Sequence, residues 1–269
     1  MDTHKQLHVS LVIPAYNEER YLKAVLDSIV AQTTMPNEVI VVDNNSTDKT
    51  ASIARSYQFV KLVQEKQQGK GYARYKGFKL AESELIATID ADTVIAQDWI
   101  EKLVRYFGEN DKVAAITGKC YFYDFPLKRL MSALQAFVYE YLQGFIAGTT
   151  ILWGSNMALR KTVWEDAIAN MPTPFINEDI DMSLKLYQAG YSIKRLTNLV
   201  ASVSLLRGQY SPKTIYSYLK PWPQTYLDNG LRIKSYFIWA LKNVVFITGL
   251  LMTALYYLGV KSKLIIGSY

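Results

Sequence analysis

The first half of this chain alternates short apolar runs with segments of helical periodicity. The runs typical of strands are at 9–13, 39–42, 59–63, 85–89 and 113–118. The segments typical of helices are at 21–32, 48–57, 69–81 and 98–107. Strands that are apolar on both sides of the pleat need cover on both faces, and strands connected through helices run parallel. We therefore expect an α/β fold with a mostly parallel, Rossmann-like sheet flanked by helices.

The second half of the chain has a different pattern. Residues 127–145 place Leu and aromatic side chains at helical spacing, with most of the charges elsewhere on the wheel. This helix either packs on the sheet or lies against lipid or a lipid acceptor. A short strand or turn is expected at 157–160, and a helix at 183–189 that Gly190 ends.

The C-terminal segment is strongly apolar. Lys242 is the one charged residue between 236 and 260, and the stretch 244–260 approaches the ~20 residues that a spanning helix needs. Lysine and arginine flank this stretch on both sides, so the charges do not fix an orientation. A spanning or re-entrant helix, an interfacial helix and a buried core helix all stay open. In each case the α/β domain would carry a helical apolar C-terminal extension.

Histidine and cysteine usage removes several chemistries. His4 and His8 are the only histidines, both in a polar leader, and Cys120 is the only cysteine. A Ser-His-Asp or Cys-His mechanism, a Cys/His zinc site and an intrachain disulfide are therefore disfavoured, and acid–base work falls to Asp, Glu, Lys or Tyr. The leader lacks the apolar core of a signal peptide, so we expect the catalytic part to be cytoplasmic. The net charge of +6 comes without a basic stripe, which argues against a nucleic-acid partner.

Two of the predicted strands end in carboxylates. Asp43 is the last residue of one strand, and Asp90-Ala91-Asp92 follows directly after another. Ligands of parallel sheets bind at the carboxyl ends of strands, so these acidic ends should converge. Hard oxygen donors suit Mg²⁺ or Mn²⁺, which in turn suit a diphosphate. The alternative is that Asp92 only begins the approach to a helix.

Six short motifs follow one another along the chain. They are Pro14-Ala15-Tyr16-Asn17-Glu18-Glu19, Val41-Val42-Asp43-Asn44-Asn45-Ser46-Thr47-Asp48, Gly69-Lys70-Gly71 with Ala73 and Gly77, Asp90-Ala91-Asp92, Gly154-Ser155-Asn156, and Glu178-Asp179-Ile180-Asp181 before Gly190-Tyr191. In this order the motifs resemble those of the family 2 glycosyltransferases, over roughly residues 7–205. The resemblance implies a GT-A fold, an inverting mechanism and a nucleotide-diphosphate sugar as donor.

The same resemblance implies a division of the chain. Residues 1–210 would be the catalytic domain, with a nucleotide-sugar half at about 1–118 and an acceptor half at about 119–210. Residues 211–269 would be a helical, membrane-associated segment.

The donor side follows from the first motifs. In the family the loop Pro14-Ala15-Tyr16 borders the nucleotide, with Tyr16 near the base and Glu18 near the ribose. Asp43 would accept a hydrogen bond from the base, and the alternative is a helix-capping turn.

Lys70 and Arg74 are candidates for diphosphate contacts, and the alternative is a solvated basic face. Asp92 would ligate the metal ion, while Asp90 would contact the ribose or a metal-bound water, with Ala91 between them in the donor site. The ion would neutralise the departing diphosphate.

The acceptor side follows from the later motifs. The resemblance makes Asp179 the general base, with Glu178 in support, so that the acceptor hydroxyl attacks the anomeric carbon opposite the diphosphate. Neighbouring carboxylates could raise the pKa of Asp179, which helps it accept a proton. The alternative is that these acids favour a helix N-terminus. Trp153, Gly154 and Asn156 are implied as acceptor contacts.

Two departures from the family pattern bear on function. No histidine lies in 200–204, so metal coordination would rest on Asp92, phosphates and water, and no Gln-x-x-Arg-Trp occurs, which disfavours a processive polymerase. We expect single-sugar transfer to a lipid-linked or surface-glycan acceptor at the cytoplasmic face of the membrane. A sugar nucleotidyltransferase and a non-catalytic membrane scaffold are the alternatives; the first would show a glycine- and basic-rich loop where this chain has an acidic one.

Overall fold

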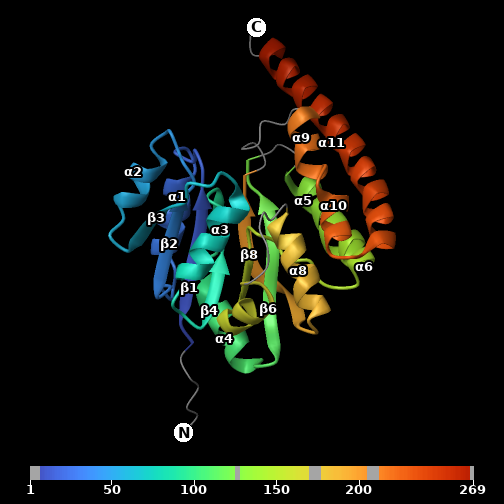
Figure 1. Ribbon diagram of the computed structural model, residues 1–269. Coiled ribbons are helices and arrows are strands. Elements are labelled where there is room, and N and C mark those ends of the chain that lie inside the picture. The colour runs from blue at the N-terminus through green and yellow to red at the C-terminus, as the bar shows by residue number, and fades with distance from the viewer. Residues whose placement is uncertain (1–6, 125–127, 170–176, 205–211, 267–269) are drawn as a thin grey trace. The chain divides into compact units, whose positions relative to one another are not determined.

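The computed structural model describes residues 7–124, 128–169, 177–204 and 212–266. Within these ranges, the side chains of Tyr139, Met252 and 255–266 are not described. The chain divides into two compact units, residues 1–205 and 206–269. Figure 1 shows the sheet and its helices in the first unit and a group of helices in the second.

The first unit alternates strands and helices as its sequence predicts. Its first half contains β1 (Val9–Ala15), α1 (Leu22–Val30), β2 (Glu38–Asp43), α2 (Thr50–Arg55), β3 (Val60–Gln64), α3 (Lys70–Leu80), β4 (Leu85–Thr88), β5 (Thr93–Ile95) and α4 (Trp99–Glu109). Its second half contains β6 (Val113–Phe122), α5 (Lys128–Ala136), the π-helix η1 (Phe137–Gln143), α6 (Gly144–Ala147), β7 (Met157–Arg160), α7 (Lys161–Ala167), α8 (Glu178–Gln188) and β8 (Ser192–Val203).

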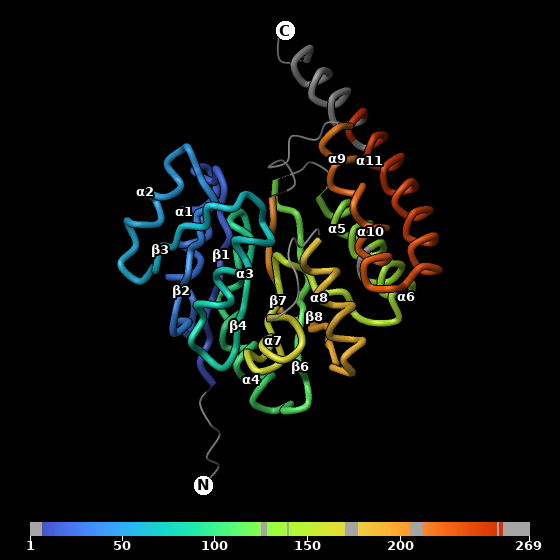
Figure 2. The backbone as a smooth tube through the Cα atoms, viewed as in Figure 1, coloured from blue at the N-terminus to red at the C-terminus, as the bar shows by residue number. Residues whose placement is uncertain are grey.

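The described strands form one sheet in the order β3-β2-β1-β4-β7-β6-β8-β5. β3, β2, β1 and β4 are parallel, and so are β6 and β8. β7 runs antiparallel to both β4 and β6, and β5 runs antiparallel to β8. Figure 2 shows β1, β2 and β4 side by side although helices separate them along the chain.

The expectation of a mostly parallel sheet is therefore wrong for the second half. The sheet is mixed because β7 follows a helical segment and re-enters between β4 and β6 in the opposite direction. β7 is four residues long and fully or partly buried, so its apolar residues carry no signal of direction.

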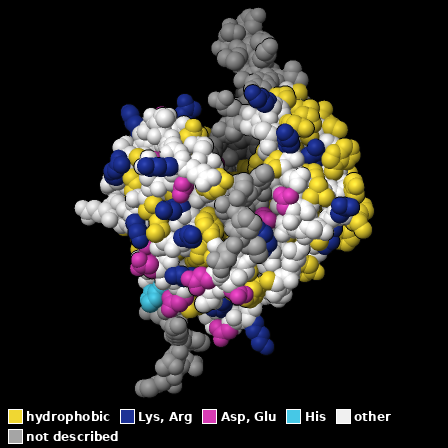
Figure 3. All heavy atoms as spheres, in the orientation of Figure 1, with side chains coloured by type: hydrophobic (Ala, Val, Ile, Leu, Met, Phe, Trp, Pro, Cys, Tyr) yellow, Lys and Arg dark blue, Asp and Glu magenta, His cyan; other side chains and the backbone are white. Residues whose placement is uncertain are grey.

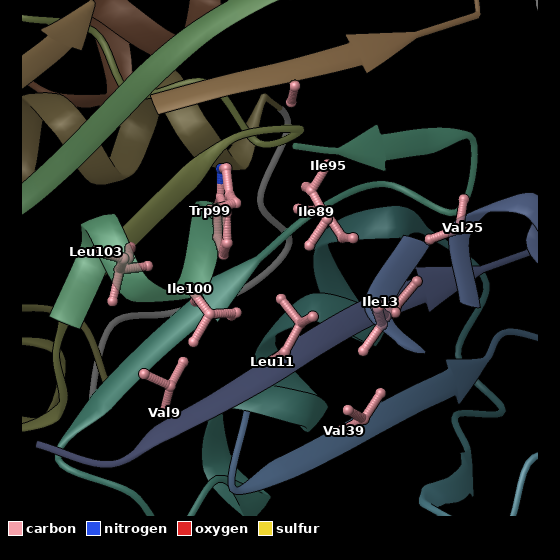
Figure 4. Packing of buried hydrophobic residues seen from close by; sticks show 14 of the residues in the cluster. Val9, Leu11, Ile13, Val25, Val39, Ile89, Ile95, Trp99, Ile100 and Leu103 are labelled. Atoms are coloured by element: carbon pink, nitrogen blue, oxygen red, sulfur yellow. The ribbon is translucent and has the colours of Figure 1, made fainter. Parts of the chain in front are cut away.

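The core lies on both faces of the sheet. Val9, Leu11 and Ile13 of β1 are fully buried in one cluster, and Figure 4 shows them beside Val25 of α1 and Ile100 of α4. Val12 of β1 points to the opposite face and belongs to the other cluster, beneath α3. A Cβ on Gly77 of α3 would lie 2.3 Å from Val12 Cγ1, so only glycine permits this close approach of α3 to the sheet.

The helix expected at 127–145 is three consecutive segments, α5, η1 and α6; residue 127 lies outside the described residues. Its inner positions, such as Ser132 and Ala147, are buried, while Leu130, Phe137, Tyr141 and Phe145 are exposed. The helix expected at 183–189 begins earlier, at Glu178, because the acidic residues before it form its first turn.

The second unit contains α9 (Pro212–Leu219), α10 (Trp222–Asp228) and α11 (Arg232–Ile266). A helix, α11, occupies the segment for which the sequence predicts an apolar C-terminal extension. In the described part of the chain, no helix combines the length and apolar character that crossing a membrane requires.

Candidate active site

Three neighbouring strands end together at one edge of the sheet. β2, β1 and β4 are adjacent and parallel, and Pro14 and Ala15 at the end of β1 pair with Val42 and Asp43. Pro14 and Ala15 are buried residues of β1, so they fix the point at which the following loop begins. The loops after the three strands share one edge, which is the convergence expected from the sequence.

The loop after β1 is joined to the loop after β2. Asn17, with a φ of 53°, donates its backbone N–H to Ser46 Oγ at 3.0 Å. The backbone N–H of Glu18 donates to Thr50 Oγ1 at 2.7 Å, and Glu18 is only 1% exposed. Tyr16 is 47% exposed at the same edge and offers a ring face on which a base can stack.

Asp43 and Asn44 have different tasks at the end of β2. Asp43 Oδ1 accepts the backbone N–H of Ser46 at 3.1 Å, which closes a side-chain turn, but this turn does not cap α2, which begins at Thr50. Asn44 is 2% exposed; its Nδ2 donates to the carbonyls of Glu65 and Gln67, and its Oδ1 accepts the N–H of Gly69 at 2.7 Å. Asn44 therefore fixes the loop that leads into α3, a role that sequence reasoning missed.

Asp90 is the centre of a buried polar network. Its Oδ2 accepts from Lys70 Nζ at 2.9 Å and from Ser155 Oγ at 2.7 Å, and its Oδ1 accepts from Arg74 Nη2 at 2.7 Å. Burial alone would raise the pKa of the Asp90 carboxyl, but Lys70 and Arg74 outweigh it and lower that pKa to about 2. Both oxygens of Asp90 are thus engaged by protein donors.

Arg74 connects Asp90 to the start of α8. Its side chain is 1% exposed, so the solvated basic face considered for it is wrong. Its Nη1 contacts Glu178 Oε1, its Nη2 also donates to the Gly154 carbonyl at 3.2 Å, and its Nε lies 3.3 Å from Thr88 Oγ1. The fork of the guanidinium suits two carboxylates at once.

Lys70 keeps a different position in the same network. Its side chain is 45% exposed, with Nζ 2.9 Å from Asp90 and 4.0 Å from Glu178. It is therefore the basic side chain of this pair that a diphosphate can reach, whereas Arg74 is held inside.

Gly154 contacts both Arg74 of this network and Asp179, the expected general base. A Cβ at this position would lie 2.7 Å from Arg74 Nη1 and 2.9 Å from Nη2, so only glycine allows the guanidinium to pass. The Gly154 N–H donates to Asp179 Oδ2 at 3.2 Å. One residue thus binds the arginine through its carbonyl and Asp179 through its N–H.

Glu178 and Asp179 form the first turn of α8. Asn177 before them adopts a left-handed φ of 56°, and the Asp179 Oδ1 accepts the N–H of Ile180 at 2.9 Å. Negative charge is favourable at a helix N-terminus. Burial and the neighbouring Glu178 raise the pKa of Asp179, whereas Lys70 and Arg74 oppose that rise. Helix start and general base are therefore compatible roles for Asp179.

Asp92 lies at the same edge, in surroundings that disfavour a negative charge more than those of Asp90 do. It is 5% exposed. Burial and the charge of Asp90 raise the pKa of Asp92 to about 7. The Tyr123 hydroxyl lies 3.4 Å from the Asp92 carbonyl oxygen, which places the segment just after β6 beside this loop.

The motif Trp153 to Asn156 is mainly structural. Trp153 is 7% exposed in the core, and Asn156 is fully buried. Asn156 Oδ1 accepts from Trp99 Nε1 at 2.9 Å, and Nδ2 donates to the Lys119 and Leu199 carbonyls at 3.0 Å. Asn156 therefore joins α4, β6 and β8, and its side chain is not placed for the acceptor contact implied by the resemblance.

The carboxylates at this edge fit a metal ion only if a bound phosphate and water supply further oxygen ligands. Among the described residues, no group of three or more His, Cys, Asp or Glu side chains could hold a metal. Asp90 is engaged by Lys70, Arg74 and Ser155, which leaves Asp92 as the candidate for a direct ligand. A hard cation here would complete its shell with phosphate and water oxygens, which Mg²⁺ and Mn²⁺ accept.

The chain is similar to known proteins in sequence and in fold. Residues 10–166 match the family model described as glycosyl transferase family 2. A curated relative is the poly-β-1,6-N-acetyl-D-glucosamine synthase of Staphylococcus epidermidis, 29% identical over 209 residues, which cover 71% of this chain and 48% of that protein. The chain thus spans about half the length of this relative.

Solved structures show the same fold. Mannosyltransferase PcManGT from Pyrobaculum calidifontis, in complex with GDP-Man and Mn²⁺, matches with a TM-score of 0.68 and 20% identity over 98% of this chain and 81% of that one. S. aureus TarS 1–349, in complex with UDP-GlcNAc, matches with a TM-score of 0.63 and 20% identity over 82% of this chain and 66% of that one.

Proposed function

Because the chain belongs to glycosyl transferase family 2 and is a glycosyltransferase, we propose that it transfers one sugar from a nucleotide-diphosphate sugar to an acceptor hydroxyl with inversion. The observation that carries the proposal is the bridge at Gly154, whose carbonyl accepts from Arg74 and whose N–H donates to Asp179. Through Arg74, this bridge connects the acidic strand end at Asp90 to the start of α8. Donor and base would meet there.

The donor would lie across the ends of β1, β2 and β4. Tyr16 would stack on the base, and Asp43 would accept from its N–H through the oxygen that the turn at Ser46 does not use. Lys70 would contact the diphosphate, since its side chain is part-exposed beside Asp90. The neighbours bound to GDP-Man and UDP-GlcNAc support a nucleotide sugar but do not choose the base for this chain.

Asp92 would hold a divalent cation together with the donor phosphates. That ion, Mg²⁺ or Mn²⁺, would act as a Lewis acid toward the departing nucleoside diphosphate. Asp90 would position the site through Lys70, Arg74 and Ser155 and contact the ribose or a metal-bound water. Support comes from the oxygen donor set and from the neighbour in complex with Mn²⁺.

Asp179 would act as the general base. Its carboxylate takes the proton of the acceptor hydroxyl as the hydroxyl oxygen bonds to the anomeric carbon and the bond from that carbon to the diphosphate oxygen breaks. A pKa above the ordinary range suits a carboxylate for accepting this proton. Glu178 remains paired with Arg74 and keeps the first turn of α8 in place.

We place the acceptor at a membrane, as a lipid-linked or surface glycan on the cytoplasmic face. The exposed Leu130, Phe137, Tyr141 and Phe145 and the apolar α11 support an apolar environment for it. One relative is named as a polymer synthase. The number of sugars added per acceptor therefore tests whether this chain transfers a single sugar.

The test of the function uses radiolabelled nucleotide sugars with Mn²⁺ or EDTA and a panel of acceptors. Transfer that needs the cation and releases nucleoside diphosphate supports the proposal. Release of pyrophosphate would instead indicate a nucleotidyltransferase, and nucleotide binding without transfer across the whole panel would indicate a scaffold.

A further inference from the structure

One side of α11 presents an unbroken apolar face. Its residues alternate three and four apart, so they lie on one side of the helix. They are Ile233, Phe237, Ala240, Val244, Ile247 and Leu251, called here the α11 outer face. All six residues are exposed. Among the large side chains, the exposed fraction runs from 58% for Val244 and Ile247 to 75% for Ile233. At 1.5 Å per residue the face is about 27 Å long.

The opposite side of α11 is already occupied. Ser235, Ile238, Leu241 and Lys242 are buried, and Ser235 Oγ donates to the Pro223 carbonyl at 2.8 Å. The Lys242 ammonium lies 5.4 Å from the ring centroid of Tyr216 in α9. The outer face is therefore the side that α9 and α10 leave open.

The unit that carries this face is strongly basic. Residues 206–269 contain eight Lys or Arg and one acidic residue, Asp228, whereas residues 1–205 contain 22 Lys or Arg and 23 Asp or Glu. The whole positive excess of the chain thus belongs to the second unit. Figure 3 shows hydrophobic side chains gathered over α11, with Lys and Arg among them.

Aromatic side chains border the same face. Tyr236 is 70% exposed and Trp239 is 59% exposed, beside Arg232 in the first turn of the helix. Tyr and Trp favour the boundary between apolar chains and water, and Lys and Arg bind anionic headgroups. Apolar length, aromatic border and positive charge are the features of a helix that lies on a membrane surface.

A second copy of this chain would match the face less well. Three-four spacing is also the pattern of a helix pair, in which opposite charges beside the seam favour the pairing. No Asp or Glu follows Asp228 in the sequence, so two copies of α11 would bring only positive charge together.

We propose that the α11 outer face lies on a bilayer surface that carries anionic headgroups, with the helix parallel to that surface. The biological purpose rests on the proposed function, since it would hold the transferase at a lipid-linked acceptor. The binding itself is a property of the second unit.

The test is sedimentation of the full chain with vesicles of phosphatidylcholine, with and without about a third of phosphatidylglycerol. The wild type should bind the anionic vesicles, more weakly as salt rises, and should bind neutral vesicles poorly. Val244→Glu and Ile247→Glu should each weaken binding to anionic vesicles by roughly tenfold, because apolar contact and charge attraction are both lost.

Val30→Glu is the matched control, since Val30 of α1 is 56% exposed and Val244 is 58% exposed. It should bind as the wild type does. Equal binding to neutral and anionic vesicles, wild-type binding by Val244→Glu, or equal loss in Val30→Glu would each overturn the proposal. So would an absence of vesicle binding together with a dimer, seen by sedimentation equilibrium, that Val244→Glu dissociates.

Nucleotide binding measured on the same samples without vesicles separates this inference from the proposed function. Val244→Glu should bind a nucleoside diphosphate with Mn²⁺ as tightly as the wild type. If the wild type binds vesicles but no nucleotide, the membrane-surface proposal holds and the proposed function is contradicted. If it binds nucleotide but no vesicles, only the membrane-surface proposal is contradicted.

Discussion

The guanidinium of Arg74 donates from Nη2 to Asp90 Oδ1 at 2.7 Å in the buried interior of the first unit. The same guanidinium contacts Glu178, which is 104 positions away in sequence. A single side chain thus sets the spacing between the acidic strand end and the first turn of α8.

Arg74→Met should destabilise the protein by about 3–5 kcal/mol, because it removes the buried guanidinium that pairs with both Asp90 and Glu178. Urea unfolding measures the loss. Arg105→Ala is the control, since the Arg105–Glu101 pair is exposed on a helix surface and should contribute under about 1 kcal/mol. Similar losses in the two variants would show that the buried network does not organise the fold.

Gly154→Ala should destabilise the protein by about 1–3 kcal/mol, because its Cβ would lie 2.7 Å from Arg74 Nη1 and would displace the guanidinium. Gly108→Ala is the matched change in open space, with no atom within 4 Å of the added Cβ. It should stabilise α4 by up to about 1 kcal/mol. Thermal unfolding of the two variants checks the opposite signs, and a stable Gly154→Ala contradicts the close approach.

Much of this site could be predicted from local sequence patterns, and its connections could not. Asp43 and the Asp90–Asp92 pair follow apolar runs, so their place at the strand ends follows from the periodicity. The sequence reading of Arg74 allowed a phosphate contact or an exposed face. Its true surroundings depend on two carboxylates that only the folded chain brings to it.

Asn156 and the sheet direction were missed for a similar reason. Asn156 stands in a motif that suggested an acceptor contact, yet three hydrogen bonds of its side chain join elements from distant parts of the chain. The antiparallel β7 is apolar like a parallel strand, so its direction is set by its neighbours. Local periodicity describes a strand's burial but not which strands flank it.

Asp92→Asn should remove the contribution of the cation to nucleotide binding. In the wild type, Mn²⁺ should tighten binding of a nucleoside diphosphate by at least about tenfold, since the ion would bridge Asp92 and the phosphates. Calorimetric titration with and without Mn²⁺ measures this. Asp98→Asn is the control, because Asp98 pairs with Lys102 on the surface of the protein. Full cation dependence in Asp92→Asn would contradict the ligand assignment.

The pH dependence of transfer should report the raised pKa of Asp179. Burial and Glu178 favour the protonated carboxyl, and only the ionised form can accept a proton from the acceptor. As pH falls, kcat/KM should therefore decline through a pKa above the ordinary 3.8 of an aspartate. Asp179→Glu should shift that acidic limb, whereas Asp181→Asn should leave it in place. A limb at or below 3.8 would speak against Asp179 as the base.

Asp179→Asn provides the most direct measurement of the central claim, that Asp179 is the base of a sugar transfer. Transfer from the labelled nucleotide sugar and binding of the nucleoside diphosphate with Mn²⁺ are measured on the same preparation. Because the amide cannot take the proton, we predict a loss of turnover of at least about a hundredfold with nucleotide binding nearly unchanged. Turnover that survives, or binding that falls in step with turnover, would contradict the account.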